Sequence, residues 1–247
     1  MKTFPFLQAK TVAYLTKALV CAALFGLSLP AMAQRVINLE NHDSKPYYFG
    51  ITLSTLSGRL NTNLHPSFLG QDTILTASPL NSPGFSLGLL ATTRLSNRFE
   101  LRFNPQLMFT DRSIFYEMRY ADRDLGSNVT QKVESVIATL PLQLKFRSDR
   151  IGNFRVYMMG GGKLDYDLAS NAQARKADDL IKIQKMDYGV EAGVGFNFYF
   201  QSFIFSPEIK ISNGLNNIHA RDVNLKYSSV LDRIQSHMIV FSIHLEG

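Results

Sequence analysis

The sequence has almost no cysteine, since Cys21 is the only one among 247 residues. It opens an N-terminal apolar run, and the preceding Val20 is larger than the residue that a lipoprotein acceptor site requires. Removal of the N-terminal segment on export would therefore leave a chain without any thiol. That excludes disulfides, thiolate metal sites and a cysteine nucleophile from the mature protein.

Long hydrophobic runs are also absent beyond the N-terminus. No later segment approaches 18 consecutive apolar residues, so the sequence predicts no transmembrane helix. The N-terminal run is itself too short to span a bilayer, which argues against an anchor helix. Its context instead predicts a signal peptide over residues 1–33. The positive region, the apolar run and the small-residue cleavage signal are Lys2, Lys10 and Lys17, then Ala18 to Leu29, then Ala31-Met32-Ala33.

Basic residues only slightly outnumber acidic residues. The full chain has 26 basic and 20 acidic residues, a net charge of +6. Three of the lysines lie in the predicted signal peptide, so the remaining 214 residues carry +3, from 23 basic and 20 acidic residues. This small excess gives little support to nucleic-acid binding, and we expect no nucleic-acid partner. The length is compatible with a single all-β domain.

The mature chain does contain two-residue alternation, repeated about eight times. In the clearest run, Asp187–Phe200, every second residue is apolar and the others are mostly polar, charged or glycine. Most runs are long enough to cross a membrane as tilted strands, which need about 9 to 11 residues. We therefore predict an all-β fold, an eight-stranded antiparallel transmembrane β-barrel. The eight runs are Tyr47–Leu56, Phe85–Leu95, Phe99–Phe109, Val136–Arg147, Phe154–Tyr166, Asp187–Phe200, Phe203–Ser212 and Ile239–Leu245.

A soluble eight-stranded barrel is the alternative, although its outer face would be polar. The connections between the runs alternate in length. This predicts short periplasmic turns and long extracellular loops, with both termini on the periplasmic side of a bacterial outer membrane. We expect a cleaved signal peptide (1–33), a periplasmic lead-in (34–46) and the barrel (47–247). The predicted long loops are 57–83, 111–131, 169–185 and 213–235, with helical patterns at 171–184 and, more weakly, 223–234.

The two faces of the runs predict two environments. One face suits lipid, and its members are Phe99, Leu101, Phe103, Leu140, Leu142, Val194, Phe196, Phe198, Ile209, Ile239, Phe241 and Ile243. The other face predicts a charge network in the lumen: Arg94, Glu100, Arg102, Lys145, Arg155, Lys163, Asp165, Asp187, Glu191, Glu208 and Lys210. Because eight strands leave room only for side chains, we interpret these charges as ion pairs that close the bore. A solute channel would need a wider barrel. Glycines 189, 193 and 195 on that face indicate bulky neighbours in the bore.

Catalysis has little support in the sequence. The candidates are loop residues whose spacing marks no catalytic triad: His65, His219 and His237 with Ser228, Ser229, Asp222 and Asp232. Gly160-Gly161-Gly162 is followed by Lys163 and Leu164, and so lacks the lysine-serine pair that follows the glycines of a phosphate-binding loop. We therefore predict no catalytic residue, no cofactor, no metal and no small-molecule substrate.

Several stretches resemble the PorT family, also called SprT in gliding species, of outer-membrane barrels of the Bacteroidota. The most telling are the SPEIKIS-x-GL block (Ser206 to Leu215) and PLQLKF followed by R-x-x-N-x-R-x-Y (Arg150 to Tyr157). PLQLKF alone is shared by many barrels of these bacteria, and the chain ends in Leu245-Glu246-Gly247 without a terminal aromatic residue. The other stretches are KPYYFGITL (45–53), PGFSLGLLATTRL (83–95), FELRFNPQLMF (99–109), TLPLQLKFRSDRIGNFRVYMMGGG (139–162) and YGVEAGVGFNFYFQSFIFSPEIKISNGLNN (188–217).

This resemblance implies a non-enzymatic role in the type IX (Por) secretion system, namely export of cargo with a C-terminal sorting signal, and gliding motility where present. It implies other type IX subunits and outer-membrane lipid as partners, and it carries over no functional residue. The alternative is a general outer-membrane barrel that stabilises the envelope or binds surface ligands through its extracellular loops. An enzyme acting on lipid or peptide is a third hypothesis.

Overall fold

Strands make up most of the chain in the computed structural model, which describes residues 36–70, 74–122, 126–169, 183–220 and 228–247. All of the described elements lie within Ile37–Gly247, and the predicted signal peptide lies outside the described residues. The elements are η1 Glu40–Ser44, β1 Tyr47–Leu64, η2 Pro66–Gly70, β2 Ile74–Leu80, β3 Ser82–Arg94, β4 Phe99–Phe103, β5 Gln106–Asp122, β6 Gly126–Arg147, β7 Phe154–Asp167, β8 Met186–Tyr199, β9 Ile204–Gly214 and β10 Leu231–Glu246.

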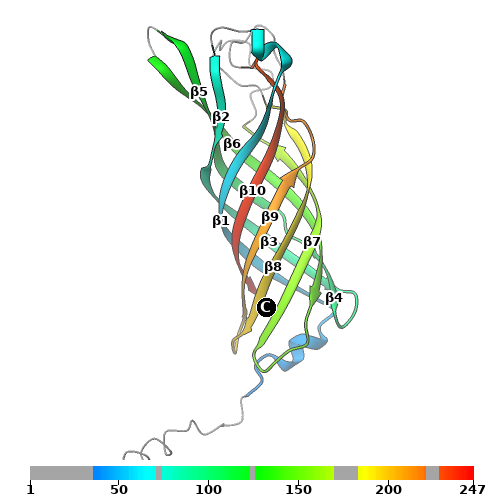
Figure 1. Ribbon diagram of the computed structural model, residues 1–247. Helices are drawn as coiled ribbons and strands as arrows, with labels where there is room; N and C mark the ends of the chain where they lie inside the picture. Colours follow the sequence, from blue (N-terminus) through cyan, green and yellow to red (C-terminus); the bar gives the residue numbers. More distant parts are fainter. Residues whose placement is uncertain (1–35, 71–73, 123–125, 170–182, 221–227) are drawn as a thin grey trace, which may run out of the picture. The chain divides into compact units, whose positions relative to one another are not determined.

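The sheet closes on itself. β1 pairs with β10 on one side and with β3 on the other, and the remaining neighbours follow in chain order around the ring (Figure 1). β2 and β3 run one after the other along β5, and β4 and β5 run one after the other between β3 and β6. Each of these two pairs therefore serves as one barrel strand. The predicted eight-stranded antiparallel barrel is confirmed.

The register fixes the size of the barrel. Paired residues followed once around the ring from Ser57, through Ile239, Ala192 and Leu144, return to β1 at Tyr47, ten residues earlier. Eight strands with this stagger tilt by about 40° and enclose only enough space for side chains. The interior is therefore expected to be a packed layer and not an open pore.

A proline interrupts one barrel strand without changing its register. Pro105 has no N–H to donate, and β4 ends at Phe103 while β5 begins at Gln106. The backbone stays attached on both sides, because Leu89 N–H donates to the Pro105 carbonyl (3.0 Å) and Asn104 N–H donates to the Pro141 carbonyl (3.3 Å). The run Phe99–Phe109 that the sequence predicts is thus one barrel strand made of two segments.

The outer surface carries a belt of exposed apolar side chains. On β1 the outward residues are apolar or aromatic from Tyr47 to Leu53, and then change to Thr55, Ser57 and Arg59. The partners of Thr55, Phe85 on β3 and Phe241 on β10, are exposed aromatic residues, so the belt is about nine residues long beside β1. At ~3.3 Å each and a tilt of ~40°, nine residues span roughly 20–25 Å, close to the apolar band of outer-membrane barrels. We call the two ends of the barrel the short-turn end, where the chain enters at β1, and the long-loop end.

Several strands continue beyond this belt into predicted loops. β1 extends to Leu64, and β5 and β6 form a long hairpin that protrudes at the long-loop end (Figure 1). The described residues within 57–83 and 111–131 are therefore largely strand and not loop. The alternation is still present there but is reversed. Ile114, Tyr116 and Met118 point inward, whereas charged neighbours point outward. A search for apolar-outward alternation misses this reversed pattern.

Neither of the two predicted helices is confirmed. Residues 170–182 lie outside the described residues, and so does most of the helix predicted at 171–184. The helix predicted at 223–234 is wrong at its end, because β10 begins at Leu231 and pairs with β1. Leu231 and Ile234 are both buried, and their three-residue spacing imitates a helical face. A bulge beside Leu64 absorbs that spacing within the strand.

The lead-in contains a short 3₁₀ helix, η1, followed by Lys45 and Pro46 and then β1. Figure 1 shows η1 at the short-turn end, close to the turn between β6 and β7. Among the described residues, no helix is long and apolar enough to cross a membrane.

Candidate functional site

The barrel interior holds the charged side chains that the sequence places on one face of the strands. Strand pleating directs alternate residues inward, so each strand contributes a row of interior side chains. From the short-turn end to the long-loop end, the interior contains an arginine-rich mouth, a charged tier and an apolar core. Each part joins residues that are far apart in the sequence.

Glu208 on β9 is the centre of the charged tier. Its carboxylate accepts hydrogen bonds from Arg102 Nη1 at 2.7 Å and from the Tyr157 hydroxyl at 2.8 Å. His244 Nε2 lies 3.4 Å from the same oxygen. All four side chains are buried, and a buried carboxylate is tolerable only with such partners.

The tier extends from Glu208 toward the short-turn end. Arg102 Nη2 also donates to Glu246 at 3.2 Å, so this guanidinium joins two carboxylates. Lys145 Nζ lies 3.7 Å from Glu100 and 4.0 Å from Glu246. It also lies 3.9 Å from the centre of the Tyr157 ring, where a cation–π interaction replaces part of its lost hydration.

The Tyr157 ring needs space that a glycine provides. Gly195 is paired with Tyr157 across β7 and β8, and a Cβ atom at Gly195 would overlap the ring and its hydroxyl. The inward glycine thus has the bulky neighbour that the sequence indicated. Without that glycine, the ring could not lie between Glu208 and Lys145.

Smaller charged groups lie along β6 to β9. Lys210 Nζ is 3.2 Å from Glu191, which also accepts a hydrogen bond from Gln143. Lys163 Nζ donates to Asp165 at 2.6 Å, and Thr139 donates to the same carboxylate at 2.5 Å. Asp187, which is paired with Asp165 across β7 and β8, accepts a hydrogen bond from the Ser236 hydroxyl on β10 at 2.6 Å.

The mouth at the short-turn end gathers arginines around one carboxylate. Asp43 on η1 lies 3.0 Å from Arg155, 3.2 Å from Arg150 and 3.7 Å from Arg147. Arg94 donates to the backbone carbonyl of Asp43, and Arg147 also pairs with Glu100 at 2.9 Å. One residue of the lead-in therefore neutralises guanidinium groups from the β6–β7 region that would otherwise repel one another.

His42, next to Asp43, is buried beneath the mouth. Its ring lies 4.7 Å from the Tyr48 ring, centre to centre, and the side chain is almost inaccessible to solvent. Burial lowers the pKa of His42 below its usual value, and Lys45 and Arg94 add to the effect, whereas Glu246 and Asp43 oppose it. The folded mouth therefore favours a neutral imidazole.

The long-loop end is filled differently. Beyond a small cluster at Leu56, Met108, Ile137, Met238 and Val240 lies a larger apolar core. This core combines apolar residues from strands and from loops. Its buried members are Leu60, Ile74, Ile114, Tyr116, Met118, Val129, Ile183, Ile218, Val230, Leu231 and Ile234.

The eleven residues predicted for the lumen all lie on the inner side. Ten of them are buried, and Arg94 is half-buried with its guanidinium at the mouth. Four of them, Arg102, Glu208, Lys145 and Glu100, belong to one network that is joined through Glu246. Elsewhere Lys210 pairs with Glu191, Lys163 with Asp165, and Asp187 with Ser236. The twelve residues predicted to face lipid all lie on the outer side, where ten are exposed and Leu101 and Ile243 are half-buried.

The predicted network omitted several important residues. Tyr48, Arg147, Tyr157 and His244 lie on the inward face within the predicted runs, so the alternation already placed them inside the barrel. Glu246 lies one residue beyond the last run, and extending the alternation to the strand end would have included it. Asp43 precedes the first strand and belongs to no alternating pattern. No feature of the sequence indicated its contacts with Arg150 and Arg155.

The catalytic candidates do not assemble into an open site. His219 Nε2 lies 2.9 Å from the Ser228 hydroxyl, but Ser228 is fully buried and His219 nearly so. His237 lies on the outer surface beside Asn213, and Asp222 lies outside the described residues. In the described part of the chain, no group of three histidine, aspartate, glutamate or cysteine residues could hold a metal ion.

Comparisons with solved structures find other barrels at low identity. Neisserial surface protein A is 12% identical, with 79% of this chain and 95% of that chain covered and a TM-score of 0.36. Ail of Yersinia pestis, solved with the heparin analogue sucrose octasulfate, is 9% identical, with 82% and 100% covered and a TM-score of 0.40. OprG from Pseudomonas aeruginosa is 14% identical, with 81% and 93% covered and a TM-score of 0.43.

No curated protein matches the chain. The family comparison is more decisive, because the profile described as "Outer membrane protein beta-barrel domain" matches residues 40–220. The match covers most of the chain and begins at η1, so it includes Asp43 as well as the strands from β1 to β9. Together with the closed ring and its apolar belt, this match shows that the chain belongs to the outer-membrane protein β-barrel domain family.

Proposed function

We propose that this protein is a non-enzymatic outer-membrane component of the type IX secretion system that acts through protein contacts. Its role is the export of cargo with a C-terminal sorting signal, and gliding motility where present. The observation that supports this most is the filled interior. Paired charges around Glu208 and an apolar core around Tyr116 occupy the bore, so we infer that the lumen network closes the barrel to solutes and cargo. A closed barrel must act through its rims and its outer surface.

The stretches that resemble the PorT family contribute directly to the short-turn end. In the R-x-x-N-x-R-x-Y stretch, Arg150 and Arg155 contact Asp43, and Tyr157 donates to Glu208. Glu208 itself belongs to the SPEIKIS-x-GL block, as does Lys210, which pairs with Glu191. The resemblance therefore coincides with the residues that build the mouth and the charged tier. This favours the short-turn end as the surface that contacts other type IX subunits.

We further propose that the short turns and both termini are periplasmic, that residues 34–46 are a lead-in docked through Asp43, and that the predicted lipid-facing residues contact outer-membrane lipid. The exposed turns then offer groups for a partner. Arg98 and Asp149, which pair at 3.0 Å, have side chains that are 59% and 82% exposed. They lie on two neighbouring turns at that end.

Deletion of the gene and complementation with variants tests the proposal. We expect the deletion to stop export of sorting-signal cargo, and the wild-type gene to restore it. Arg98→Glu with Asp149→Lys should reduce export without loss of folded barrel, because both side chains are exposed. Normal export in the deletion strain would refute the secretion role. A pull-down of the tagged protein from gently solubilised outer membranes, compared with an unrelated barrel, should recover type IX subunits.

The alternative function is a general outer-membrane barrel that stabilises the envelope or binds surface ligands. The long-loop end supports it, because the strands extend past the apolar belt and enclose their own core. Such an end is a rigid platform for loops. Under this alternative, shortening the β5–β6 hairpin abolishes the function while export of sorting-signal cargo continues.

A further inference from the structure

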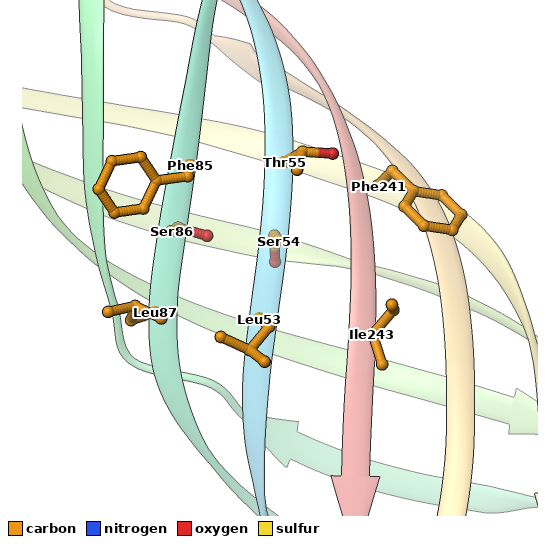
Figure 2. A pocket seen from close by; sticks show the side chains of 8 residues that line it. All are labelled: Leu53, Ser54, Thr55, Phe85, Ser86, Leu87, Phe241 and Ile243. Carbon is orange, nitrogen blue, oxygen red and sulfur yellow. The ribbon is translucent and has the colours of Figure 1, made fainter.

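A groove runs along the outer face of β1, within the upper part of the apolar belt. Thr55 is paired with Phe85 on β3 and with Phe241 on β10, so a small side chain lies between two large ones. Figure 2 shows the two rings turned away from Thr55 on either side, with Leu53, Leu87 and Ile243 below. These side chains border a hollow of about 390 Å³. Its apolar lining suits a hydrocarbon chain.

The groove continues toward the long-loop end and meets a basic group. Ser57, the next outward residue, again lies between larger neighbours, Pro83 and Ile239. Arg59 follows on the same face, opposite His237 on β10. Arg59 is exposed and forms no ion pair with any residue that the structure describes. At ~3.4 Å per residue, Arg59 lies about 14 Å from Thr55 along the strand, near the edge of the belt.

A second groove on the same barrel has the opposite charge at its edge. It lies between β3, β5 and β6, has a volume of about 330 Å³ and is lined by Phe85, Phe109 and Val136. Its polar edge carries Asp111 and Glu134, which are paired across β5 and β6. The belt is therefore basic beside one groove and acidic beside the other.

We propose that the Thr55 groove binds one acyl chain of an anionic membrane lipid whose acidic head group pairs with Arg59. The apolar lining holds the chain, and the exposed Arg59 guanidinium at the edge, which pairs with no residue that the structure describes, selects the charge of the head group. A single basic group at the membrane surface favours an anionic lipid about fivefold. The Phe109 groove, with its two carboxylates, should show no preference or should disfavour the same lipid. This inference concerns lipid and is independent of the secretion role.

The chain contains no tryptophan, so one introduced tryptophan reports on its own surroundings. Phe241→Trp places the reporter in the Thr55 groove, and Phe109→Trp places a matched reporter in the acidic-edged groove. Each variant is reconstituted in vesicles of phosphatidylcholine and phosphatidylglycerol, with bromine on the acyl chains of one lipid at a time. The two quenching curves give the relative affinity for the two lipids at each site.

We expect Phe241→Trp to show about a fivefold preference for phosphatidylglycerol, and Phe109→Trp to show none or the reverse. Adding Arg59→Gln should remove the preference at Phe241→Trp, and adding Glu134→Gln should leave it unchanged. Thr55→Phe, which fills the groove, should lower quenching of the same reporter by both lipids. Because Arg59 and Thr55 point outward, heat-modifiable mobility should confirm that each variant is folded. Equal preference at the two reporters, or a preference that survives Arg59→Gln, would overturn the proposal.

Discussion

The membrane-embedded part of the barrel and its extension at the long-loop end are built from the same strands with opposite patterns. Within the belt, Glu208 and Arg102 point inward and Val194 and Phe196 point outward. Beyond it on β5, Ile114 and Tyr116 point inward while Asp111 and Glu117 point outward. The pleat does not change between the two parts. What changes is the surroundings of the outer face, from lipid to water.

The two parts consequently depend on different interactions. In the charged tier, each buried group is stabilised by a particular partner, and loss of one partner leaves an uncompensated charge. In the apolar core, stabilisation is spread over many contacts and scales with the area and volume that are buried. Single substitutions should therefore have larger and more global effects in the charged tier.

Reversing the charge of Glu208 should have the largest effect. Glu208→Lys would bury a cation beside Arg102 and Lys210, and loss of a buried pair costs about 3–5 kcal/mol. We expect loss of heat-modifiable mobility and a lower urea midpoint in detergent. Glu134→Lys, an exposed acid on β6, is the control and should change neither. Unchanged mobility of Glu208→Lys would contradict the paired-charge account of the tier.

Truncation in the apolar core should cost slightly less and act locally. Ile114→Ala removes part of a fully buried side chain, which typically costs about 2–5 kcal/mol. Because the core lies beyond the belt, we expect protease to cleave the β5–β6 hairpin while the membrane-embedded strands remain folded. Phe115→Ala, on the opposite and half-buried face, should cause less cleavage. Global unfolding of Ile114→Ala would show that the two parts are not independent.

The third prediction concerns Asp43 at the mouth, a carboxylate that is only partly buried. Asp43→Asn leaves Arg147, Arg150 and Arg155 without their shared carboxylate, and hydrogen bonds to charged groups contribute about 1.5–3 kcal/mol. Amide hydrogen exchange should become faster in residues 38–45 and stay unchanged in β7. Asp149→Asn, which breaks an exposed pair with Arg98, is the matched control and should cost less than about 1 kcal/mol. Equal exchange in both variants would refute the role of Asp43 in docking.

Lowering the pH should have the smallest effect on stability, and it should act on the same segment, residues 38–45. Burial lowers the pKa of His42, so the detached segment binds a proton more readily than the docked one. The contribution of neutral His42 to docking is complete above about pH 6.5 and is lost as the pH falls from there through the lowered pKa. Exchange in residues 38–45, corrected for intrinsic rates, should therefore be faster at pH 5.5 than at pH 7.5. His42→Phe should remove this difference, and a difference that persists would assign it to another group.

The sequence predicted the membrane-embedded part of the molecule better than the extension. Two-residue alternation identified all eight barrel strands and placed Glu208 and Val194 on opposite faces. This was possible because successive side chains of a pleated strand point to opposite faces of the sheet. It did not identify the strand residues beyond the belt, such as Ile114, since there the apolar face is the inner one. The start of β10 was missed for another reason, because Leu231 and Ile234 have helical spacing and only pairing with β1 makes them part of a strand.

In the candidate site, too, one part was predictable from the sequence and another part was not. The sequence by itself determined which side chains point inward, because that depends only on local backbone geometry and on the need to place apolar groups against lipid. Only the tertiary structure decided which of them meet. The stagger of ten residues brings Arg102 to Glu208 and Glu246, and docking of the lead-in brings Asp43 to Arg150 and Arg155. Such pairings depend on the register summed around the closed ring, which no local segment encodes.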